Sequence, residues 1–289
     1  MDLQKNIVLA NFTTLRVGGS ADYFVHAKSA EDLIKAYDFA REHNLPFFLL
    51  GGGSNTFFHE AGFRGVVIRN EYEGLDFSDN KITAASGSLL ANVVGLALRH
   101  QLSGLENLVG IPGTIGGAIA GNAGVPKQSI GEILLEAEIY NGKERRIVKP
   151  DFFKFSYRTS SLKEKKSIIL LKVILKLKAG ERNNLRISAQ EILAERLAKQ
   201  PYKFPSAGSF FKNPIGEKSA GWYLDQAGCK GWTEGGAKIS EKHANFIINF
   251  QNATSFDIIN LAYRARKAVE EKFGIKLEQE VVMIGEGNE

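Results

Sequence analysis

The sequence predicts an α+β protein. Strand and helix patterns alternate along the chain, two glycine-rich segments interrupt them, and the pattern changes near residue 186. The composition, with 44% hydrophobic and 24% charged residues among 289, is ordinary for a globular protein. This length suits about two domains. We therefore expect a glycine-rich ligand-binding part to about residue 180 and a smaller α+β part after it.

The first part begins with a β-α-β pattern. Residues 22–28 alternate like a strand, and Ser29 with Asp32 marks the start of a helix. The apolar run 46–50 is a short strand that leads directly into the first glycine segment. Further elements are expected as strands at 66–69, 82–85 and 167–177, a helix at 88–100 and a tight hairpin at Asn141-Gly142.

The second part is predicted mainly from helix patterns. A helix is expected over 186–199 and a shorter one over 219–227. A third helix, over 255–273, repeats apolar residues on one face and ends at Gly274, a typical helix stop. The chain is expected to end in a strand over 275–286.

The bulk properties exclude several classes of function. The net charge is +5, but the basic residues are spread over the chain rather than collected in one stripe, so we expect no nucleic-acid partner. The sequence has no apolar run long enough for a membrane span and no secretory signal at its start. Cys229 is the only cysteine and the five histidines lack metal-ligand spacing. We therefore expect a cytoplasmic protein without a bound metal and without membrane insertion. A monomer is the working expectation, although these properties do not give the oligomeric state.

The first glycine segment follows a predicted strand. Consecutive glycines let backbone N–H groups converge on an anion, and Ser54 and Asn55 can add side-chain donors. A Rossmann fingerprint would need its third glycine at Thr56, so that motif is excluded. A flexible turn is the alternative, but a turn does not require Ser-Asn after three glycines, and ligand binding is favoured. The candidate cofactor-binding residues here are Leu50, Gly51, Gly52, Gly53, Ser54 and Asn55.

The second glycine segment, residues 110–124, has the sequence GIPGTIGGAIAGNAG. It is too apolar for a linker and too rich in glycine for a stable helix interior. Such a segment indicates backbone that lies flat against a large planar group. Together, the two segments suggest a dinucleotide held without a Rossmann motif. The candidate residues are Gly110, Ile111, Pro112, Gly113, Thr114, Gly116, Gly117, Ala118, Gly121 and Asn122.

The pairing of LGGGSN (50–55) with GIPGTIGGAIAGNAG (110–124) resembles the UDP-N-acetylenolpyruvoylglucosamine reductases, the MurB family. The resemblance extends in order over nearly the whole chain. Further matching segments are residues 11–19, 157–158, 208–214, 239–245 and 277–281. Because the chain passes directly from Arg158 to the strand at 167, it resembles the shorter subtype, which lacks an additional substrate-covering insertion.

The resemblance implies a domain organisation. Residues 1–185 would form an FAD-binding fold of the vanillyl-alcohol-oxidase type, built of two α+β subdomains at about 1–65 and 66–185. Residues 186–275 would form a smaller α+β substrate-binding domain, and 276–289 a C-terminal strand that returns to the active site.

The resemblance also implies an activity: reduction of UDP-N-acetyl-enolpyruvoylglucosamine to UDP-N-acetylmuramate in peptidoglycan synthesis, and so in cell-wall biogenesis. Non-covalent FAD would be the cofactor and NADPH the co-substrate. Some members of the wider fold link FAD to a histidine near the first glycine segment. His59 is the nearest histidine here, and we do not expect it to be linked.

Three residues are implied to be catalytic. The flavin supplies the hydride, so the protein must hold the substrate carboxylate and deliver a proton. Arg158 would clamp the carboxylate as an enolate develops, because a guanidinium grips a carboxylate with two parallel bonds. Ser209 would donate the proton, although without the resemblance a turn serine is the better interpretation. Glu280, where the last strand changes from polar to apolar, would share a proton with the developing enol.

The resemblance also implies a set of substrate-binding residues. Tyr157 lies beside Arg158, and Asn213 matches a substrate-binding asparagine of the family. Lys212 could meet the substrate diphosphate. His243 corresponds to a substrate-contacting position, but a structural histidine is equally compatible with the sequence. The candidate substrate-binding residues are Tyr157, Arg158, Lys212, Asn213 and His243.

Two other functions remain open from the residues. The chain could be another flavoprotein of the same fold, such as a hydroxy-acid or sugar-lactone oxidase, or a non-catalytic nucleotide-binding protein that keeps the glycine loops. The matching contexts of Arg158, Ser209 and Glu280 argue against the second alternative. NADPH oxidation that depends on the enolpyruvyl UDP-sugar would separate all three.

Overall fold

The computed structural model describes residues 1–125, 128–165, 167–216 and 218–285. The chain divides into two compact units. Residues 286–289, which include the last residue of the strand predicted over 275–286, lie outside the described residues. The first unit consists of Met1–Gln4, Phe24–Gly52 and Gly65–Arg196, and the second of Lys5–Tyr23, Gly53–Arg64 and Leu197–Glu289.

The first sheet has four strands, which in spatial order are β1 (Leu3–Val8), β2 (Ser20–Ala27), β5 (Phe63–Asn70) and β3 (Phe47–Leu50). Helix α1 (Ala30–Glu42) begins where Ser29 Oγ accepts a hydrogen bond from Asp32 N at 3.1 Å, as the sequence predicts. Tyr37 on α1 packs edge-on against Phe47 of β3, with ring centroids 5.0 Å apart. The β-α-β start is therefore confirmed. Strands β3 and β5 are parallel, and Leu50 pairs with Arg69 at their carboxyl ends.

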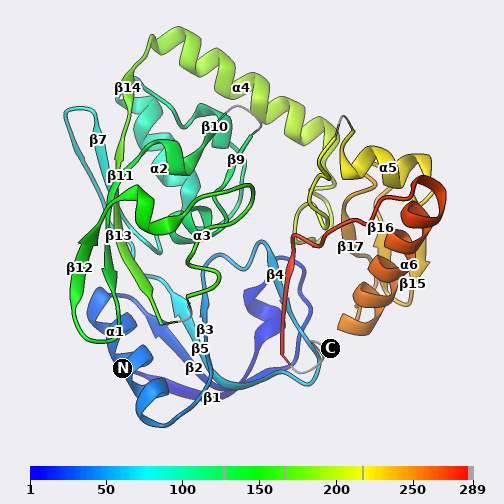
Figure 1. Ribbon diagram of the computed structural model, residues 1–289, viewed down its shortest axis with the longest axis horizontal. Helices are drawn as coiled ribbons and strands as arrows, with labels where there is room; N and C mark the ends of the chain where they lie inside the picture. The colour runs from blue at the N-terminus through cyan, green and yellow to red at the C-terminus, as the bar shows by residue number, and fades with distance from the viewer. Residues whose placement is uncertain (126–127, 166, 217, 286–289) are drawn as a thin grey trace. The chain divides into compact units, whose positions relative to one another are not determined.

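The second sheet is antiparallel. Its spatial order is β12 (Arg145–Val148), β11 (Leu134–Tyr140), β13 (Ile169–Lys176), β7 (Lys81–Ala85) and β6 (Leu75–Ser78). Helices α2 (Leu90–Arg99) and α3 (Ile115–Ala120) lie on one side of this sheet (Figure 1). Their apolar side chains share a core with the sheet, which includes Ile82, Val93, Ile119, Ala137 and Val173.

The remaining elements that lie wholly or mostly in the first unit are short, except for a long helix. They are β8 (Leu102–Ser103), η2 (Glu106–Leu108), β9 (Gly124–Val125), β10 (Gln128–Ser129), η3 (Ile130–Glu132), η4 (Pro150–Phe153), β14 (Lys178–Ala179) and the helix α4 (Arg182–Lys199).

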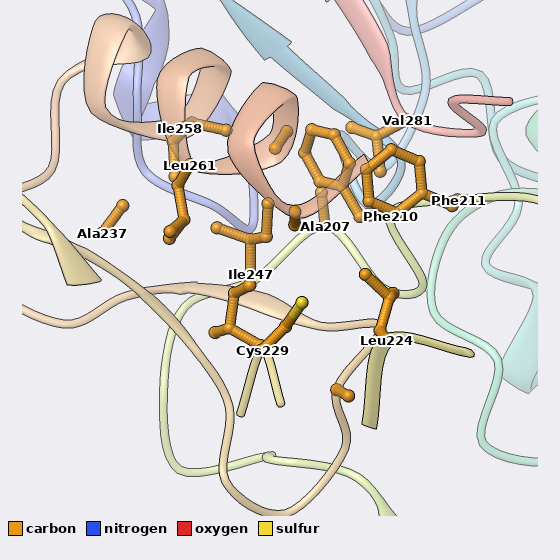
Figure 2. Close-up of a cluster of buried hydrophobic side chains, with 14 of the residues drawn as sticks. Ala207, Phe210, Phe211, Leu224, Cys229, Ala237, Ile247, Ile258, Leu261 and Val281 are labelled. Atoms are coloured by element: carbon orange, nitrogen blue, oxygen red, sulfur yellow. The ribbon is translucent and has the colours of Figure 1, made fainter. Parts of the chain in front are cut away.

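The second unit packs a long helix against small strands. Its elements are η1 (Leu9–Phe12), β4 (Thr56–Phe58), α5 (Ala220–Gln226), β15 (Thr233–Glu234), β16 (Ala237–Ile239), β17 (Ile247–Asn249), α6 (Ser255–Phe273) and β18 (Val282–Ile284). Figure 2 shows Ile258 and Leu261 of α6 in a buried cluster with Phe210, Cys229 and Ile247. Strand β18 pairs in parallel with β4, so the end of the chain lies beside the segment that follows the first glycines.

Four sequence predictions need correction. The second glycine segment does form a helix, the six-residue α3, because Thr114 caps it and Gly116 packs closely against the Ser86 backbone. Helix α4 begins at Arg182, four residues before the predicted 186. The predicted terminal strand over 275–286 is a strand only at Val282–Ile284 in the described residues. The strands β15, β16 and β17 are too short to give an alternating pattern, and the sequence did not predict them.

No helix among the described residues is long and apolar enough to cross a membrane.

Replacing Leu261 by alanine should destabilise the second unit. Its side chain is fully buried in the core formed by α6 and the small strands, so truncation leaves a cavity. We expect the free energy of unfolding to fall by about 2–5 kcal/mol. Tyr263 lies two residues along the same helix with 57% of its surface exposed, so Tyr263→Ala is the matched control. Urea unfolding of both variants checks this, and equal losses would contradict the packing described.

Candidate active site

The two glycine segments meet in the first unit. A methyl group added at Gly51 would lie 2.7 Å from Thr114 Oγ1, and one added at Gly52 would lie 2.6 Å from Gly113 Cα. Real Cβ atoms do not approach their neighbours so closely. Both glycines are therefore required by the contact between the segments, a packing role that the sequence did not reveal.

The second glycine segment combines tight packing with one open position. Thr114 Oγ1 accepts a hydrogen bond from Gly117 N at 3.3 Å and caps α3. A methyl group at Gly116 would lie 2.8 Å from Ser86 O, so Gly116 lies against the neighbouring backbone. Gly117 is exposed, and a methyl group there would meet only Thr114 Oγ1, at 3.6 Å. Gly117 is thus the position in this helix where a ligand could approach the backbone.

A pocket of about 490 Å³ opens beside the contact between the two segments. Arg69, at the end of β5, lines this pocket and donates a hydrogen bond from Nη1 to the carbonyl oxygen of Gly51. Burial lowers the pKa of the Arg69 guanidinium, and the nearby Glu71 carboxylate raises it. Arg69 carries no distinct signal in the sequence, where it is only an arginine at the end of a predicted strand. The pocket is lined by Lys28, Arg69, Asn70, Glu71, Glu73, Gly87, Leu89 and Thr114.

The turn that carries Arg158 is hydrogen-bonded to the end of the second glycine segment. Asn122 Nδ2 donates to Ser156 O at 3.0 Å, and Arg158 Nη1 donates to Gly124 O at 3.0 Å. Arg158 has a φ of 57°, which is uncommon for a residue with a side chain. Tyr157 beside it is 55% exposed, with its ring 5.6 Å from Arg158 Cζ. The first unit therefore brings Tyr157 and Arg158 to the glycine segment.

The remaining catalytic candidates meet in the second unit. Phe210, next to Ser209, accepts a hydrogen bond from Glu280 N at 2.8 Å, and Lys212 N donates to Glu278 O at 2.8 Å. The motif of residues 208–214 therefore pairs with the segment that precedes β18. Asn55, at the end of the first glycine segment, donates from Nδ2 to Glu280 O at 3.2 Å. Backbone pairing thus brings Asn55, Ser209 and Glu280 together.

The side chain of Asn245 holds this paired segment in place through hydrogen bonds to the backbone of Phe211. It is 3% exposed, and its side chain accepts from Phe211 N at 2.9 Å and donates to Phe211 O at 2.8 Å. Its own carbonyl oxygen accepts from Phe210 N at 2.7 Å. Asn245 lies in the 239–245 segment, where the sequence alone gives it no distinct role. A buried asparagine that satisfies both polar groups of one residue holds the backbone rigidly.

The three substrate-binding candidates of the second unit have protein partners. Lys212 Nζ forms an ion pair with Glu278, and Asn213 Oδ1 accepts from Ala220 N at 3.0 Å. His243 Nδ1 accepts from Asn245 N at 3.2 Å. Burial lowers the pKa of His243, so its imidazole is neutral at pH 7. The structural role left open for His243 is therefore present, and its contact with substrate stays a prediction.

The lone cysteine has no catalytic environment. Cys229 is buried, and burial raises the pKa of its thiol to about 11, which keeps it protonated at neutral pH. In the described part of the chain, no group of three or more His, Cys, Asp or Glu side chains could hold a metal ion.

Comparisons with known proteins agree with this arrangement. A family model for an FAD-binding domain matches residues 21–147, and one for the C-terminal domain of UDP-N-acetylenolpyruvoylglucosamine reductase matches residues 200–284. The fold is therefore that of a flavoprotein, with an FAD-binding domain followed by a smaller C-terminal domain, and the predicted α+β class is confirmed.

Relatives of nearly the same length give the family. A UDP-N-acetylenolpyruvoylglucosamine reductase of Caldanaerobacter subterraneus subsp. tengcongensis is 38% identical, over 98% of this chain and 94% of its own. One of Moorella thermoacetica is 40% identical, over 98% and 93%. The crystal structure of the Thermus caldophilus reductase (MurB) matches with a TM-score of 0.85 at 34% identity, over 99% of this chain and 100% of its own. The chain belongs to the UDP-N-acetylenolpyruvoylglucosamine reductase family.

Gly52→Ala should destabilise the protein without its cofactor, whereas Gly117→Ala should not. Neither glycine has a positive φ, so the difference rests on the space for the methyl group. At Gly52 it would press on the Gly113 backbone, and we expect a loss of about 1–3 kcal/mol. At Gly117, inside helix α3, the methyl group has room. We expect the free energy of unfolding to stay the same or to rise by up to about 1 kcal/mol. Thermal unfolding of the flavin-free variants tests this, and the opposite ranking would contradict the described contact.

Proposed function

We propose that this protein reduces UDP-N-acetylenolpyruvoylglucosamine to UDP-N-acetylmuramate for peptidoglycan synthesis, with NADPH as the reductant and non-covalent FAD as the cofactor. Family membership supports the substrate. One structural observation supports the chemistry: the backbone pairing that brings Ser209 and Glu280 together beside Asn55. The proposal includes a cytoplasmic monomer, and the single buried Cys229 is compatible with a reducing compartment.

FAD would be held by the two glycine segments. Their close contact, the exposed backbone at Gly117 and the adjoining polar pocket fit an extended dinucleotide. When bound, FAD supplies the chemistry of accepting a hydride from NADPH and giving it to the methylene carbon of the substrate. The proposed contacts are Leu50, Gly51, Gly52, Gly53, Ser54, Asn55, Gly110, Ile111, Pro112, Gly113, Thr114, Gly116, Gly117, Ala118, Gly121 and Asn122.

Arg158 would hold the substrate carboxylate. A guanidinium that grips the carboxylate with parallel hydrogen bonds would stabilise the negative charge that builds up as the enolate forms. The hydrogen bond from Asn122 to Ser156 fixes the turn, and the left-handed backbone at Arg158 requires such support. The exposed Tyr157 ring lies where it can contact the same ligand.

Ser209 would deliver the proton to the carbon that bears the carboxylate. A free serine hydroxyl is a poor acid, so Ser209 must act within a polar network that includes Glu280. The ion pair between Lys212 and the exposed Glu278 is weak in water, and a substrate diphosphate could replace the glutamate. Asn213 and His243 would complete the substrate site within a substrate-binding domain of about 186–275. The FAD-binding region would be 1–185, and residues 276–289 would return to the site.

Ser209→Ala should separate the two half-reactions. Reduction of bound FAD by NADPH requires no proton from Ser209, so its rate should change little. Reoxidation of the flavin by the UDP-sugar requires that proton, and its rate constant should fall by about 10²–10⁴-fold with little change in substrate affinity. Stopped-flow flavin absorbance measures both halves.

Ser206→Ala is the matched control, because Ser206 lies in the same segment and has no proposed role. A wild-type flavin that NADPH reduces but the UDP-sugar does not reoxidise would overturn the proposed function in favour of another flavoprotein. Equal slowing of both halves in Ser209→Ala would show that Ser209 supports the flavin or the fold, and that the acid lies elsewhere.

A further inference from the structure

The pocket of the first unit lies at the carboxyl ends of β2 and β5. Lys28 follows β2, while Arg69 and Asn70 end β5. Thr114, the cap of α3, lines the pocket from the second glycine segment. All eight lining residues fall within residues 21–147, the range matched by the FAD-binding domain. The pocket therefore touches the second glycine segment at Thr114, and Arg69 links it by a hydrogen bond to Gly51 of the first segment. Most of its lining residues are polar or charged.

Arg69 has more hydrogen-bond donors than acceptors around it. A guanidinium carries five N–H donors. Among the described residues, one acceptor is recorded for them, the Gly51 carbonyl oxygen that Nη1 reaches, and the buried Nε has no hydrogen-bond partner. The Arg69 side chain is 22% exposed. Buried donors in folded proteins are almost always satisfied, so the guanidinium lacks a partner that a ligand could supply.

The neighbouring carboxylate does not provide that partner. Glu71 Oε1 lies 3.9 Å from Arg69 Nε, beyond hydrogen-bond distance, and accepts a hydrogen bond from His26 Nδ1 at 3.0 Å. No described residue thus supplies the missing acceptor, and a ligand in the pocket is in a position to do so. An arginine that faces a pocket beside glycine backbone matches a phosphate oxygen, because guanidinium and phosphate form charge-assisted hydrogen bonds.

We propose that Arg69 is a cofactor-positioning residue: it donates to a phosphate oxygen of FAD while its Nη1 keeps the first glycine segment in place through Gly51. Cofactor affinity and the shape of the loop would then depend on the same guanidinium. The inference rests on the proposed use of FAD, and it adds a side-chain contact to a site otherwise built from glycine backbone.

The test compares FAD with riboflavin, which has the same ring system but no phosphate. Flavin-free full-length protein is titrated with each, and fluorescence quenching gives the two dissociation constants. Arg69→Gln should weaken FAD binding by about 10- to 100-fold, the range expected for a hydrogen bond to a charged group. Riboflavin binding should weaken much less, because only the hydrogen bond to Gly51 is lost to it. Arg64→Gln is the matched control, because it removes a charge from the other end of β5, where Arg64 pairs with Asp22.

Several outcomes would overturn the inference. Equal weakening of FAD and riboflavin would mean that Arg69 only shapes the loop, and unchanged FAD affinity would mean that it does not reach a phosphate. Slower reduction by NADPH at unchanged FAD affinity would assign the pocket to NADPH. If Arg69→Gln does not fold, Arg69→Met, which also removes the charge and the donors, replaces it: a much larger loss for FAD than for riboflavin supports the inference, and equal losses or none contradict it. A wild-type protein that binds no FAD would overturn the proposed function as well.

Discussion

The close contact between the two glycine segments is the constraint on which the first unit depends. Gly52 has no room for a methyl group because the Gly113 backbone lies there, and Gly51 has none because of the Thr114 hydroxyl. This contact joins the end of β3 to the start of α3. The Arg158 turn is attached further along the same segment through Asn122. The backbone of the two glycine segments therefore forms most of the candidate site in the first unit, and few side chains contribute to it.

In the second unit, hydrogen bonds rather than close packing hold the segments of the candidate site in place. Asn245 is buried, and its side chain forms hydrogen bonds with both the N–H and the C=O of Phe211. These bonds hold the segment that carries Ser209 against Asn245. The segment that carries Glu280 is fixed by its pairing with Phe210 and by Asn55. If Ser209 and Glu280 act as proposed, such fixation from several contacts is what a preorganised site requires.

The sequence predicted those elements whose signals are local. Helix α6 begins and ends as predicted because Thr254 and Asp257 form a capping box and Gly274 adopts the left-handed conformation that ends a helix. Helix α3 was missed because intrinsic propensity disfavours glycine, while tertiary packing decides the conformation there. Arg69 and Asn245 were missed for a related reason. Their importance comes from partners far away in the sequence, and a single sequence without the fold carries no such signal.

The central claim is that this chain holds FAD non-covalently between its glycine segments, and the state of the flavin tests it most directly. The purified protein should show flavin absorbance, and acid precipitation should release all of it into the supernatant, where chromatography identifies intact FAD. Flavin that remains with the precipitate would contradict the non-covalent site. A colourless protein that takes up no FAD on reconstitution would contradict the account as a whole.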